Sequence, residues 1–403
     1  MENMEPLLPN HLTQKEIIML GAFYTPGRIV KLVISLINKY LEEFKYKNIV
    51  VLDSSAGYGV FLREMNNKNV DIRASEYDGR LKPYLSKITN EDNIFLTNSL
   101  INVSREKFKI PETSFLIIIG NPPYNDVTSE YKKGAKGSII ADRDLLDRDL
   151  GISFLKSYDK LKANVVCVLH PLSFIIKEAN FNRLKTFKEN YKLIDGIIFP
   201  SSMFYYTSRS TPFPVLVALY ERVTNGMKYD YIKKFRFKIL DMNKEFILES
   251  FNTTDGYINK YPPRKKQIKL SDIGLYYHSF RDINSLLRNA SFMDKPHYNG
   301  IVVTLDNFYK YAYLFAFKAL FKPKNKWLYG NLSPLIDIDY LENKKTYFVK
   351  YAIKNNKVLR NLKPERLKRI FDYYGIEDIK QIEKDISSIE LEIKRHILSL
   401  AKI

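Results

Sequence analysis

The sequence predicts an α/β fold, a doubly wound and mainly parallel sheet covered by helices, followed by a second domain of different character. Three observations carry this prediction. Apolar runs of strand length alternate with helical patterns through the first half of the chain, and most of these runs end in a polar residue. Residues 226–403 are also far more basic, with 34 Lys and Arg against 20 Asp and Glu, compared with 30 against 25 in residues 1–225.

The composition bounds the class of protein. The chain has 403 residues, of which 45% are hydrophobic and 14% aromatic, enough for two or three domains with real cores. The formal charge of +19 favours a polyanionic partner, with nucleic acid as the first candidate. A Lys-rich proteome would give the same totals, so the charge alone does not identify the partner.

Cysteine and histidine usage points away from disulfides and structural metal sites. The single cysteine, Cys167, lies in the apolar run 165–169 and is expected to be buried. The five histidines are scattered, and one cysteine cannot supply a zinc-binding spacing, so no metal is expected. The first ten residues lack a signal-peptide core, and no apolar run reaches the ~18 residues of a membrane span, so we expect a cytoplasmic protein.

The first elements precede the sheet. A short helix is expected over residues 13–20. Thr25 and Pro26 are typical of a helix start, with Thr as the N-cap and Pro at the first helical position. Apolar residues from Ile29 to Leu41 then recur on one helical face. Tyr24, just before this helix, would serve equally well as a core anchor.

The first strand, residues 49–52, ends in Asp53 and a turn of small residues. Gly57 and Gly59 would let the backbone approach a ligand closely. A lone G-x-G is a weak signal, and neither a phosphate-binding P-loop nor a full dinucleotide fingerprint is present. Because Asp53 directly before the turn would repel pyrophosphate, it favours a ligand with a cationic end, such as an ammonium or a sulfonium.

A second acid follows at the spacing of ribose-binding residues. Glu76 ends the next strand pattern, about twenty residues further along, and could bind both ribose hydroxyls. It would also fit an ordinary surface position. A third short strand, residues 94–96, leads to the polar stretch 97–99, which contains Asn98.

The central strand, residues 115–119, ends abruptly in Gly120 and the tetrapeptide 121–124. Its three consecutive isoleucines suit a buried parallel strand, and the prolines cannot continue the ladder. We therefore expect Asn121, the Pro122 carbonyl and the Tyr124 ring at the ligand-binding edge of the sheet, where they could grip a flat ring carrying an NH₂ group. An ordinary strand-ending turn is the alternative.

The remainder of the first domain continues the alternation. A polar loop is expected over 125–151 and a domain boundary near 224–226, which gives a first domain of residues 1–224 and a second of residues 225–403. Further elements are expected as a helix around 154–161, a strand over 165–169, a helix over 181–192, and strands over 194–199 and 215–220.

Basic and aromatic residues interleave after residue 225. Such segments suit phosphate contacts combined with base stacking, although about half of the lysines would belong to an ordinary solvated surface. The run 311–321 is expected in the core, and an amphipathic helix is expected over about 378–401. The basic segments are 233–238, 261–266, 322–327 and 360–369.

Four stretches, in this order, resemble the N6-adenine-specific DNA methyltransferases of bacterial restriction-modification systems, with the motif order of their gamma class. They are Phe23-Tyr24-Thr25-Pro26, the Asp53–Gly59 loop, Glu76, and Asn121-Pro122-Pro123-Tyr124. The resemblance covers about residues 15–220. It implies a Rossmann-like methyltransferase sheet, S-adenosylmethionine as the cofactor, and a C-terminal target recognition domain of mixed α+β structure.

The resemblance also assigns roles. Tyr24 and Thr25 would line the methionine end of the cofactor, Glu76 its ribose and Asn98 its adenine. The Gly-loop residues that would surround the amino-acid part are Asp53, Ala56, Gly57 and Gly59. The expected catalytic residues are Asn121, Pro122, Tyr124 and Phe204, with Phe199 as the fallback for Phe204.

The chain departs from the family at three positions. Asn98 stands where the family usually has Asp, so cofactor binding would lack a charge-assisted hydrogen bond. Ser54 replaces a common Pro in the Gly-loop. Leu116 replaces an Asp at the start of the central strand, to which we attach no catalytic meaning.

The resemblance implies direct transfer of a methyl group to the N6 atom of an adenine flipped out of double-stranded DNA. Asn121 and the Pro122 carbonyl would accept the two amine hydrogens, and Tyr124 and Phe204 would hold the base between them. A monomer bound to DNA in the bacterial nucleoid, and a cognate restriction endonuclease encoded separately, would complete the system.

Enzymes with the same tetrapeptide signature act on other substrates, and these substrates remain alternatives. Related enzymes methylate the glutamine amide of release factors or the amino group of guanine in ribosomal RNA. N4-cytosine DNA methyltransferases are nearer rivals, although they usually carry Ser in place of Asn121. A module that binds DNA without chemistry is disfavoured by the intact tetrapeptide.

Overall fold

The computed structural model divides the chain into two compact units, Met1–Leu248 and Glu249–Ile403. It describes residues 13, 24–43, 46–65, 69–124, 141–204, 207, 211–262 and 271–403. The expected boundary at residues 224/225 lies too early, because strands β8 (Phe237–Ile239) and β9 (Met242–Phe246) extend the sheet of the first unit. Apart from Thr13, the helix expected over 13–20 lies outside the described residues.

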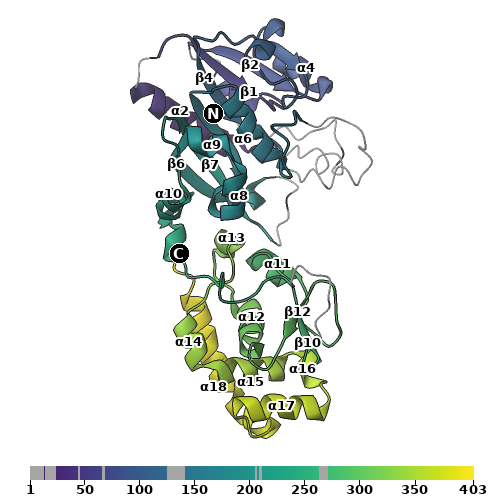
Figure 1. The fold of residues 1–403 in the computed structure, drawn as a ribbon. Coiled ribbons are helices and arrows are strands. Elements are labelled where there is room, and N and C mark those ends of the chain that lie inside the picture. The colour runs from purple at the N-terminus through teal and green to yellow at the C-terminus, as the bar shows by residue number, and fades with distance from the viewer. Residues whose placement is uncertain are drawn as a thin grey trace. The chain divides into compact units, whose positions relative to one another are not determined.

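Unit 1 alternates strands and helices, as the sequence predicts (Figure 1). Its strands before β8 are β1 (Ile49–Asp53), β2 (Asp71–Glu76), β3 (Ile94–Leu96), β4 (Phe115–Gly120), β5 (Val165–Pro171), β6 (Tyr191–Pro200) and β7 (Pro214–Arg222). Its helices are α2 (Gly27–Glu43), α3 (Val60–Met65), α4 (Lys82–Leu85), α6 (Leu150–Lys160), α7 (Ser173–Ile176), α8 (Glu178–Arg183), α9 (Thr186–Asn190) and α10 (Tyr229–Lys234).

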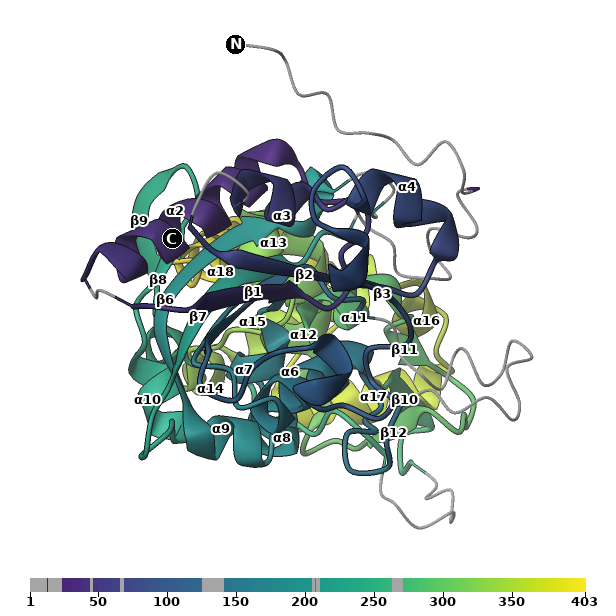
Figure 2. The same ribbon diagram turned by 90° about the horizontal axis from the view of Figure 1, so that it is seen from above.

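One nine-stranded sheet forms the centre of unit 1, in the order β3-β2-β1-β4-β5-β7-β6-β8-β9. Strands β1 to β5 run parallel, whereas β7 lies antiparallel between β5 and β6. Helices α2 and α3 cover one face and α6, α8 and α9 the other (Figure 2). This is a doubly wound, Rossmann-like α/β sheet, so the predicted fold class is confirmed.

The strand order reverses between β1 and β4. The chain moves outward from β1 to β2 and β3, then returns to place β4 on the other side of β1. Asp53 pairs with Ile119 in register, so the turn after β1 and the segment after β4 leave the sheet side by side. A crevice at such a switch point is where doubly wound sheets bind ligands.

Helix α2 fixes one wall of this edge. Its buried residues, including Ile29, Val33 and Ile37, recur at helical spacing and pack on the apolar face of the sheet. The predicted helix is therefore confirmed, beginning one residue after Pro26. Cys167, on β5, is fully buried as expected.

Two predictions for the middle of unit 1 need correction. The single helix expected over 181–192 is wrong, because α8 ends at Arg183 and the backbone of Lys185 takes a left-handed φ of 50° before α9. Strand β6 already begins at Tyr191. The polar loop expected over 125–151 ends before Leu150, where α6 begins with buried residues.

Unit 2 combines a small sheet with helices, so its mixed α+β character is confirmed. Its antiparallel sheet has the order β11-β10-β12. These strands are β10 (Leu275–His278), β11 (Phe292–Met293) and β12 (Gly300–Val303), and the helices are α11 (Ile283–Arg288), α12 (Phe308–Leu320), α13 (Lys326–Tyr329), α14 (Ile338–Asn343), α15 (Lys345–Asn355), α16 (Lys357–Arg360), α17 (Pro364–Tyr374) and α18 (Ile379–Ser399).

The core of unit 2 lies where α12, α15 and α18 pack together. Tyr313 and Phe348 meet there with ring centroids 5.2 Å apart. The last helix is confirmed, but its buried stripe is Ile382, Ile389, Ile393 and Ile397, whereas Ile379 is 41% exposed at the helix start. Within the described part of the chain, no helix is both long and apolar enough to cross a bilayer.

Candidate active site at the carboxyl edge of the sheet

The tetrapeptide after β4 leaves the sheet at the switch point, as predicted. The Asn121 amide nitrogen donates a hydrogen bond to the Thr25 hydroxyl, 3.1 Å away. The Tyr124 hydroxyl donates to the amide oxygen of Asn121. The structure thus brings Thr25, Asn121 and Tyr124 together, and the two contacts define which way the amide points.

Gly120 allows this segment to lie against the end of β1. Its φ of 141° belongs to the region that glycine favours, and a Cβ there would lie only 2.6 Å from the Asp53 Oδ1 atom. A side chain at residue 120 would therefore displace the Asp53 carboxyl. Glycine here joins the end of β4 to the first acid of the site.

Asp53 is a buried acid with an unsatisfied oxygen. Its side chain belongs to a residue that is 1% exposed, and its Oδ1 accepts the Ser55 backbone N–H at 3.0 Å. Among the described residues its Oδ2 has no hydrogen-bond partner. Burial raises the pKa of Asp53 to about 7, the Ser55 N–H opposes this rise, and the charge of Glu76 adds to it. A cationic ligand group would satisfy this carboxyl.

Glu76, at the end of β2, is held by backbone N–H groups. Its Oε2 accepts from Gly57 at 2.7 Å, and its Oε1 accepts from Tyr77 at 2.8 Å and from Asp78 at 2.9 Å. Burial raises the pKa of Glu76, while these three N–H groups oppose the rise. The carboxyl is thus fixed beside the Gly-loop, rather than lying on the surface like an ordinary Glu.

Gly57 and Gly59 have different structural roles. A Cβ on Gly57, which has a φ of 55°, would meet only the Tyr24 ring at 3.9 Å, so this turn leaves open space for a ligand. A Cβ on Gly59 would collide with Ile88 and Leu85. Gly59 therefore lets α3 start against α4, a packing role that the sequence analysis did not foresee.

Ala56 lies behind the loop. It is buried, and its N–H donates to the Ser75 carbonyl at 2.9 Å, which ties the loop to β2. Its side chain belongs to the hydrophobic core of unit 1. Of the four expected Gly-loop residues, Asp53 and Gly57 present atoms or space at the edge, whereas Ala56 and Gly59 support them.

Asn98 follows β3, as expected, but its side-chain oxygen is already engaged. It accepts the Leu100 backbone N–H at 2.9 Å, which closes a turn. The backbone carbonyl of Asn98 accepts from the Lys107 ammonium at 2.7 Å. A ligand amino group would have to share the amide oxygen with this turn.

Aromatic rings surround the Gly-loop. The Tyr24 ring lies 5.0 Å from the Tyr58 ring, and Tyr58 meets Tyr84 edge to face at 4.7 Å. Burial raises the pKa of Tyr24, so its phenol stays neutral. Sequence reasoning missed Tyr58 and Tyr84, although the position of Tyr58 between the two glycines was a usable signal.

A chain of hydroxyls explains the Ser in the Gly-loop. The Ser54 hydroxyl lies 3.0 Å from the Tyr158 hydroxyl of α6, a contact that proline could not make. The Ser99 hydroxyl lies 2.7 Å from that of Ser75 and donates to the Ser54 carbonyl at 2.6 Å. These bonds hold the ends of β1, β2 and β3 in fixed relation.

The expected aromatic partner of Tyr124 lies in the core. Phe204 is 4% exposed and packs against Phe199, with ring centroids 5.6 Å apart, while Phe199 is fully buried. Tyr124 packs against the same core cluster. The stacking role of Phe204 therefore stays a prediction that requires the ring to become accessible. Leu116 is buried within β4.

The start of α6 supports the motif from the other side. A Cβ on Gly151 would lie 2.6 Å from the Phe174 ring and 3.6 Å from the Pro123 carbonyl oxygen. Glycine therefore lets α6 pack closely against the Phe174 ring of α7, while the Pro123 carbonyl oxygen lies at ordinary contact distance. The sequence predicts a loop at Gly151, and its place inside helix α6 is revealed only by the structure.

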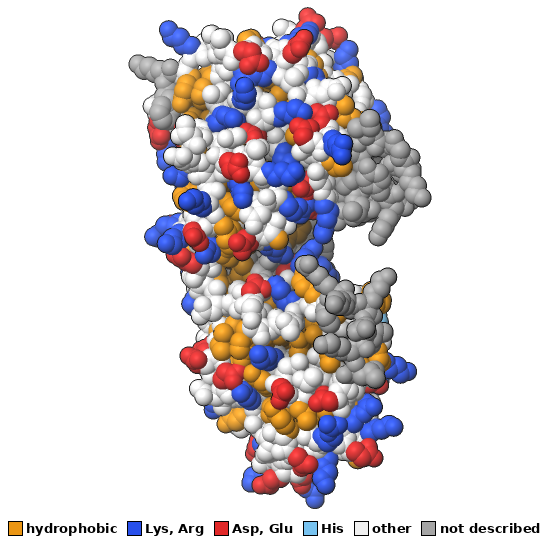
Figure 3. Space-filling model, in the orientation of Figure 1, with side chains coloured by type: hydrophobic (Ala, Val, Ile, Leu, Met, Phe, Trp, Pro, Cys, Tyr) orange, Lys and Arg blue, Asp and Glu red, His pale blue; other side chains and the backbone are white. Residues whose placement is uncertain are grey.

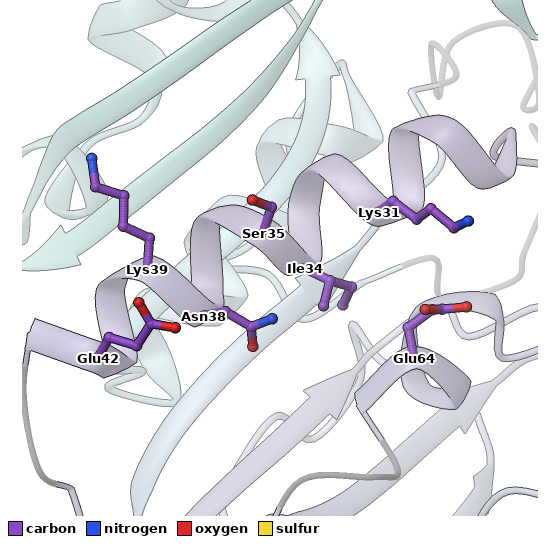
Figure 4. Close-up of a pocket in the computed structure, with 7 residues that line it drawn as sticks. All are labelled: Lys31, Ile34, Ser35, Asn38, Lys39, Glu42 and Glu64. Carbon is purple, nitrogen blue, oxygen red and sulfur yellow. The ribbon is translucent and has the colours of Figure 1, made fainter.

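A separate hollow lies on the outer side of α2 and shares no residue with this site (Figure 4). It has a volume of about 360 Å³. Its lining is Lys31, Ile34, Ser35, Asn38, Lys39, Glu42 and, from α3, Glu64. The mixed charges cancel there, and none of these residues contacts the tetrapeptide in a hydrogen bond or ion pair among the described residues.

A curated methyltransferase is similar to the chain in sequence. The chain is 25% identical over 295 residues to the type II methyltransferase M.HincII of Haemophilus influenzae, which covers 69% of this chain and 53% of that protein. The chain thus spans about half the length of this curated relative. No family model matches the chain.

Solved structures with a similar fold cover about half of the chain. One is described as a putative class I S-adenosylmethionine-dependent methyltransferase of Listeria monocytogenes, with 17% identity, 51% of this chain and 62% of that chain covered, and a TM-score of 0.36. Another is TrmN of Thermus thermophilus, with 13% identity, 52% of each chain covered, and a TM-score of 0.31.

Proposed function

We propose that this protein transfers a methyl group from S-adenosylmethionine to the N6 amino group of adenine in a specific double-stranded DNA sequence. The observation that carries the proposal is the group of Asn121, the Pro122 carbonyl and Tyr124 at the switch point, directly beside Asp53. This arrangement places acceptors for an exocyclic amine next to a carboxyl that suits a cationic cofactor.

The residues of the cofactor side fit S-adenosylmethionine. The unpartnered oxygen of Asp53 would face the positively charged amino-acid part, and the carboxyl of Glu76 would bind the ribose hydroxyls. The open space at Gly57 admits a ligand close to the backbone. Bound there, the cofactor supplies a methyl group on a sulfonium centre.

Asn121 and Pro122 would activate the amine. An exocyclic amine conjugated with a purine is a poor nucleophile, because its lone pair is delocalised into the ring. The Asn121 oxygen and the Pro122 carbonyl would each accept one N–H, which draws the nitrogen toward tetrahedral geometry and exposes the lone pair. Thr25 holds the amide so that its oxygen, and not its nitrogen, faces the amine.

Tyr124 would have two tasks. Its ring would stack on the flipped base, and its hydroxyl occupies the Asn121 oxygen before the base arrives. The incoming N–H would add to or replace this hydroxyl. Phe204 is proposed as the second stacking ring, once its side chain has left the core.

Two observations favour DNA over other substrates. The similarity to a type II methyltransferase is the first, and the basic unit 2, with 28 Lys and Arg against 17 Asp and Glu, is the second. Methylation of a protein would not need that charge. Methylation of adenine or guanine in RNA is the second candidate, because the Asn-Pro-Pro-Tyr signature also occurs in enzymes that methylate the amino group of guanine in ribosomal RNA.

The same proposal includes how the target is recognised and where and with which partner the enzyme acts. Unit 2 would recognise the target sequence, and the enzyme would act as a monomer on DNA in the bacterial cytoplasm. A cognate restriction endonuclease, encoded separately, would be blocked by the modification. The Asn at position 121, where N4-cytosine enzymes usually have Ser, favours adenine over cytosine.

The test is to express the chain in a host without DNA methylation and to sequence its DNA with a readout that separates N6-methyladenine from N4-methylcytosine. Methyladenine at one recurring motif is expected. Methylcytosine would move the assignment to the N4 class. Unmodified DNA from a host that accumulates folded, cofactor-binding protein would contradict the proposal.

A further inference from the structure

Most of the basic charge of α15, and that of Lys344 directly before it, is neutralised within unit 2. Lys344 lies 2.9 Å from Glu392, Lys350 lies 2.7 Å from Asp385, and Lys354 lies 2.8 Å from Glu383. A count of charges therefore overstates the surface available to a polyanion. The cations available to bind a polyanion are those without an acidic partner among the described residues.

One long stretch of unit 2 contains no acid at all. Residues 307–336 hold five lysines and neither Asp nor Glu. Two of these lysines have internal contacts, because Lys310 lies over the Tyr257 ring at 3.9 Å and Lys318 donates to the Asn289 carbonyl. The other three are Lys322, Lys324 and Lys326.

Lys322, Lys324 and Lys326, the lysine triad, have no carboxylate within ion-pair distance among the described residues of the chain. Lys322 and Lys324 are exposed, and Lys326 is half-buried. They alternate along the chain from the end of α12 to the first residue of α13, separated by Pro323 and Asn325. This is an unpaired cationic surface at close spacing.

The frame of the triad is fixed at both ends. Phe321 is fully buried and stacks on Phe317 with ring centroids 4.4 Å apart. On the other side Leu328 and Tyr329 are fully buried, and the Tyr329 hydroxyl accepts the Ile403 N–H at 3.0 Å. A short segment between two buried anchors costs little entropy to order further, so its cations are preorganised for a ligand.

The triad is electrostatically unsatisfied. Burial lowers the pKa of Lys326, and the positive charge of Lys322 lowers it further. Two cations held near each other without an anion repel, and an anion placed between them would relieve this repulsion. Trp327, the single tryptophan of the chain, follows Lys326 directly and is partly exposed.

We propose that the lysine triad contacts the phosphate backbone of the DNA duplex that carries the target base, with Trp327 at the border of the contact. The inference rests on the proposed DNA methyltransferase function and adds the surface of unit 2 that binds the duplex. Three lysines at this spacing suit successive phosphates, and contacts of this kind fix the position of the protein without reading sequence.

A rival surface lies on α16 and α17. Figure 3 shows blue side chains gathered over these helices at the lower end of the view, where Lys357, Arg360 and Lys363 are exposed. Two further cations there are used internally, since Arg369 donates to the Asp272 carbonyl at 2.7 Å and the Arg366 guanidinium covers Gly274. An acid, Glu365, also interrupts this run.

The first test compares three variants of the full chain, each with three charges removed. They are K322Q/K324Q/K326Q in the triad, K357Q/R360Q/K363Q in the rival surface, and K380Q/K384Q/K394Q on exposed positions of α18 as the matched control. Binding of target duplex is measured over a series of salt concentrations. The triad variant should reduce the salt slope by about 2 to 3, because each phosphate contact contributes about 0.9, and the other two should leave it within about 1 of wild type.

Three results would overturn the inference. They are an unchanged slope in the triad variant, an equal loss in the α18 control, and a larger loss in the rival variant. Methylation at saturating DNA should stay near the wild-type rate in the triad variant, since the tetrapeptide is untouched. Absence of DNA methylation by the wild-type chain would instead contradict the proposed function, so the two failures are distinguishable.

The second test needs no substitution. Trp327 is the single tryptophan, so fluorescence excited selectively from tryptophan reports on this segment alone. Target duplex should protect Trp327 from the neutral quencher acrylamide. Full quenching in the saturated complex would contradict the inference, and equal protection by duplex RNA would contradict DNA as the partner.

Discussion

The two units handle polar groups in opposite ways. In unit 1 the polar residues of the site are buried at one sheet edge and tied by short hydrogen bonds, as between Ser99 and Ser54. In unit 2 the candidate ligand-binding groups are the three lysines of the triad, which form no ion pair with any described carboxylate. Burial and fixed bonds suit chemistry, whereas unpaired surface charge suits association with a polyanion.

The largest effect is expected from N121A. Removing the amide should lower the methylation rate about 10²–10³-fold, the cost of removing one preorganised hydrogen-bonding group in comparable sites. Cofactor affinity should stay within about threefold, because Asp53 and Glu76 are unchanged. Rates are measured in single turnover with saturating DNA. Near wild-type turnover of N121A would show that Asn121 takes no part in the chemistry.

The second effect concerns the pH dependence of cofactor binding. If the cationic end binds ionised Asp53, whose pKa is raised to about 7, affinity should fall about tenfold per pH unit below pH 7 and level off above it. The D53N variant should bind weakly at all pH values and lose this slope. Calorimetric titration between pH 5.5 and 8.5 measures both, and a pH-independent wild type would contradict the assignment.

The third effect separates the two tasks of Tyr124. The Y124A variant should lose about 10-fold to 100-fold in methylation, because base stacking contributes about 1–3 kcal/mol. The Y124F variant keeps the ring and removes the hydroxyl that bonds Asn121, so its rate should stay within about threefold of wild type. Equal losses in both variants would show that the hydroxyl, not the ring, is the important group.

The fourth effect is on stability. Because the pKa of Asp53 is raised from the ordinary value of 3.8 to about 7, ionisation of this carboxyl costs folding free energy. This cost grows as the pH rises from 3.8 to about 7 and is constant above pH 7. D53N should therefore raise the free energy of unfolding by about 2 kcal/mol at pH 8 and leave it nearly unchanged at pH 4. Urea unfolding at the two pH values tests this. A variant that destabilises at pH 8 would argue against the burial cost.

The smallest effect is expected from N98D. A carboxylate would accept a ligand N–H with charge assistance, so cofactor affinity should rise about twofold to tenfold. The Leu100 N–H that now bonds the Asn98 oxygen can bond a carboxylate equally well. The N98A variant is the control and should bind more weakly than wild type. Lower affinity in N98D would place the adenine elsewhere.

Much of unit 1 was predictable because its signals are local. Isoleucine-rich β4 and the prolines after it predict a buried strand that ends at Asn121, and β1 and β3 follow in the same way. The additional strands β8 and β9 were not predictable, since Phe237–Ile239 overlaps the basic segment 233–238 and gains its strand character by pairing with β6.

The parts of the site that escaped prediction depend on contacts between distant residues. Nothing local indicates that the hydroxyl of Tyr158 reaches Ser54, or that Gly59 makes room for Ile88. The burial of Phe204 is of the same kind, because an aromatic residue in a polar loop suits either a surface or a core position. Sequence patterns fix which residues leave the sheet, and packing decides which of them face the ligand.

The placement of β7 has a consequence for biosynthesis. On a growing chain Val165–Pro171 and Tyr191–Pro200 are made before Pro214–Arg222, yet the later strand lies between the other two and pairs with both. Until Arg222 has left the ribosome, β5 and β6 carry unpaired apolar edges, the kind of surface that recruits other chains. A premature stop between β6 and β7 would leave both edges open permanently. Such truncated products should be aggregation-prone and dependent on chaperones.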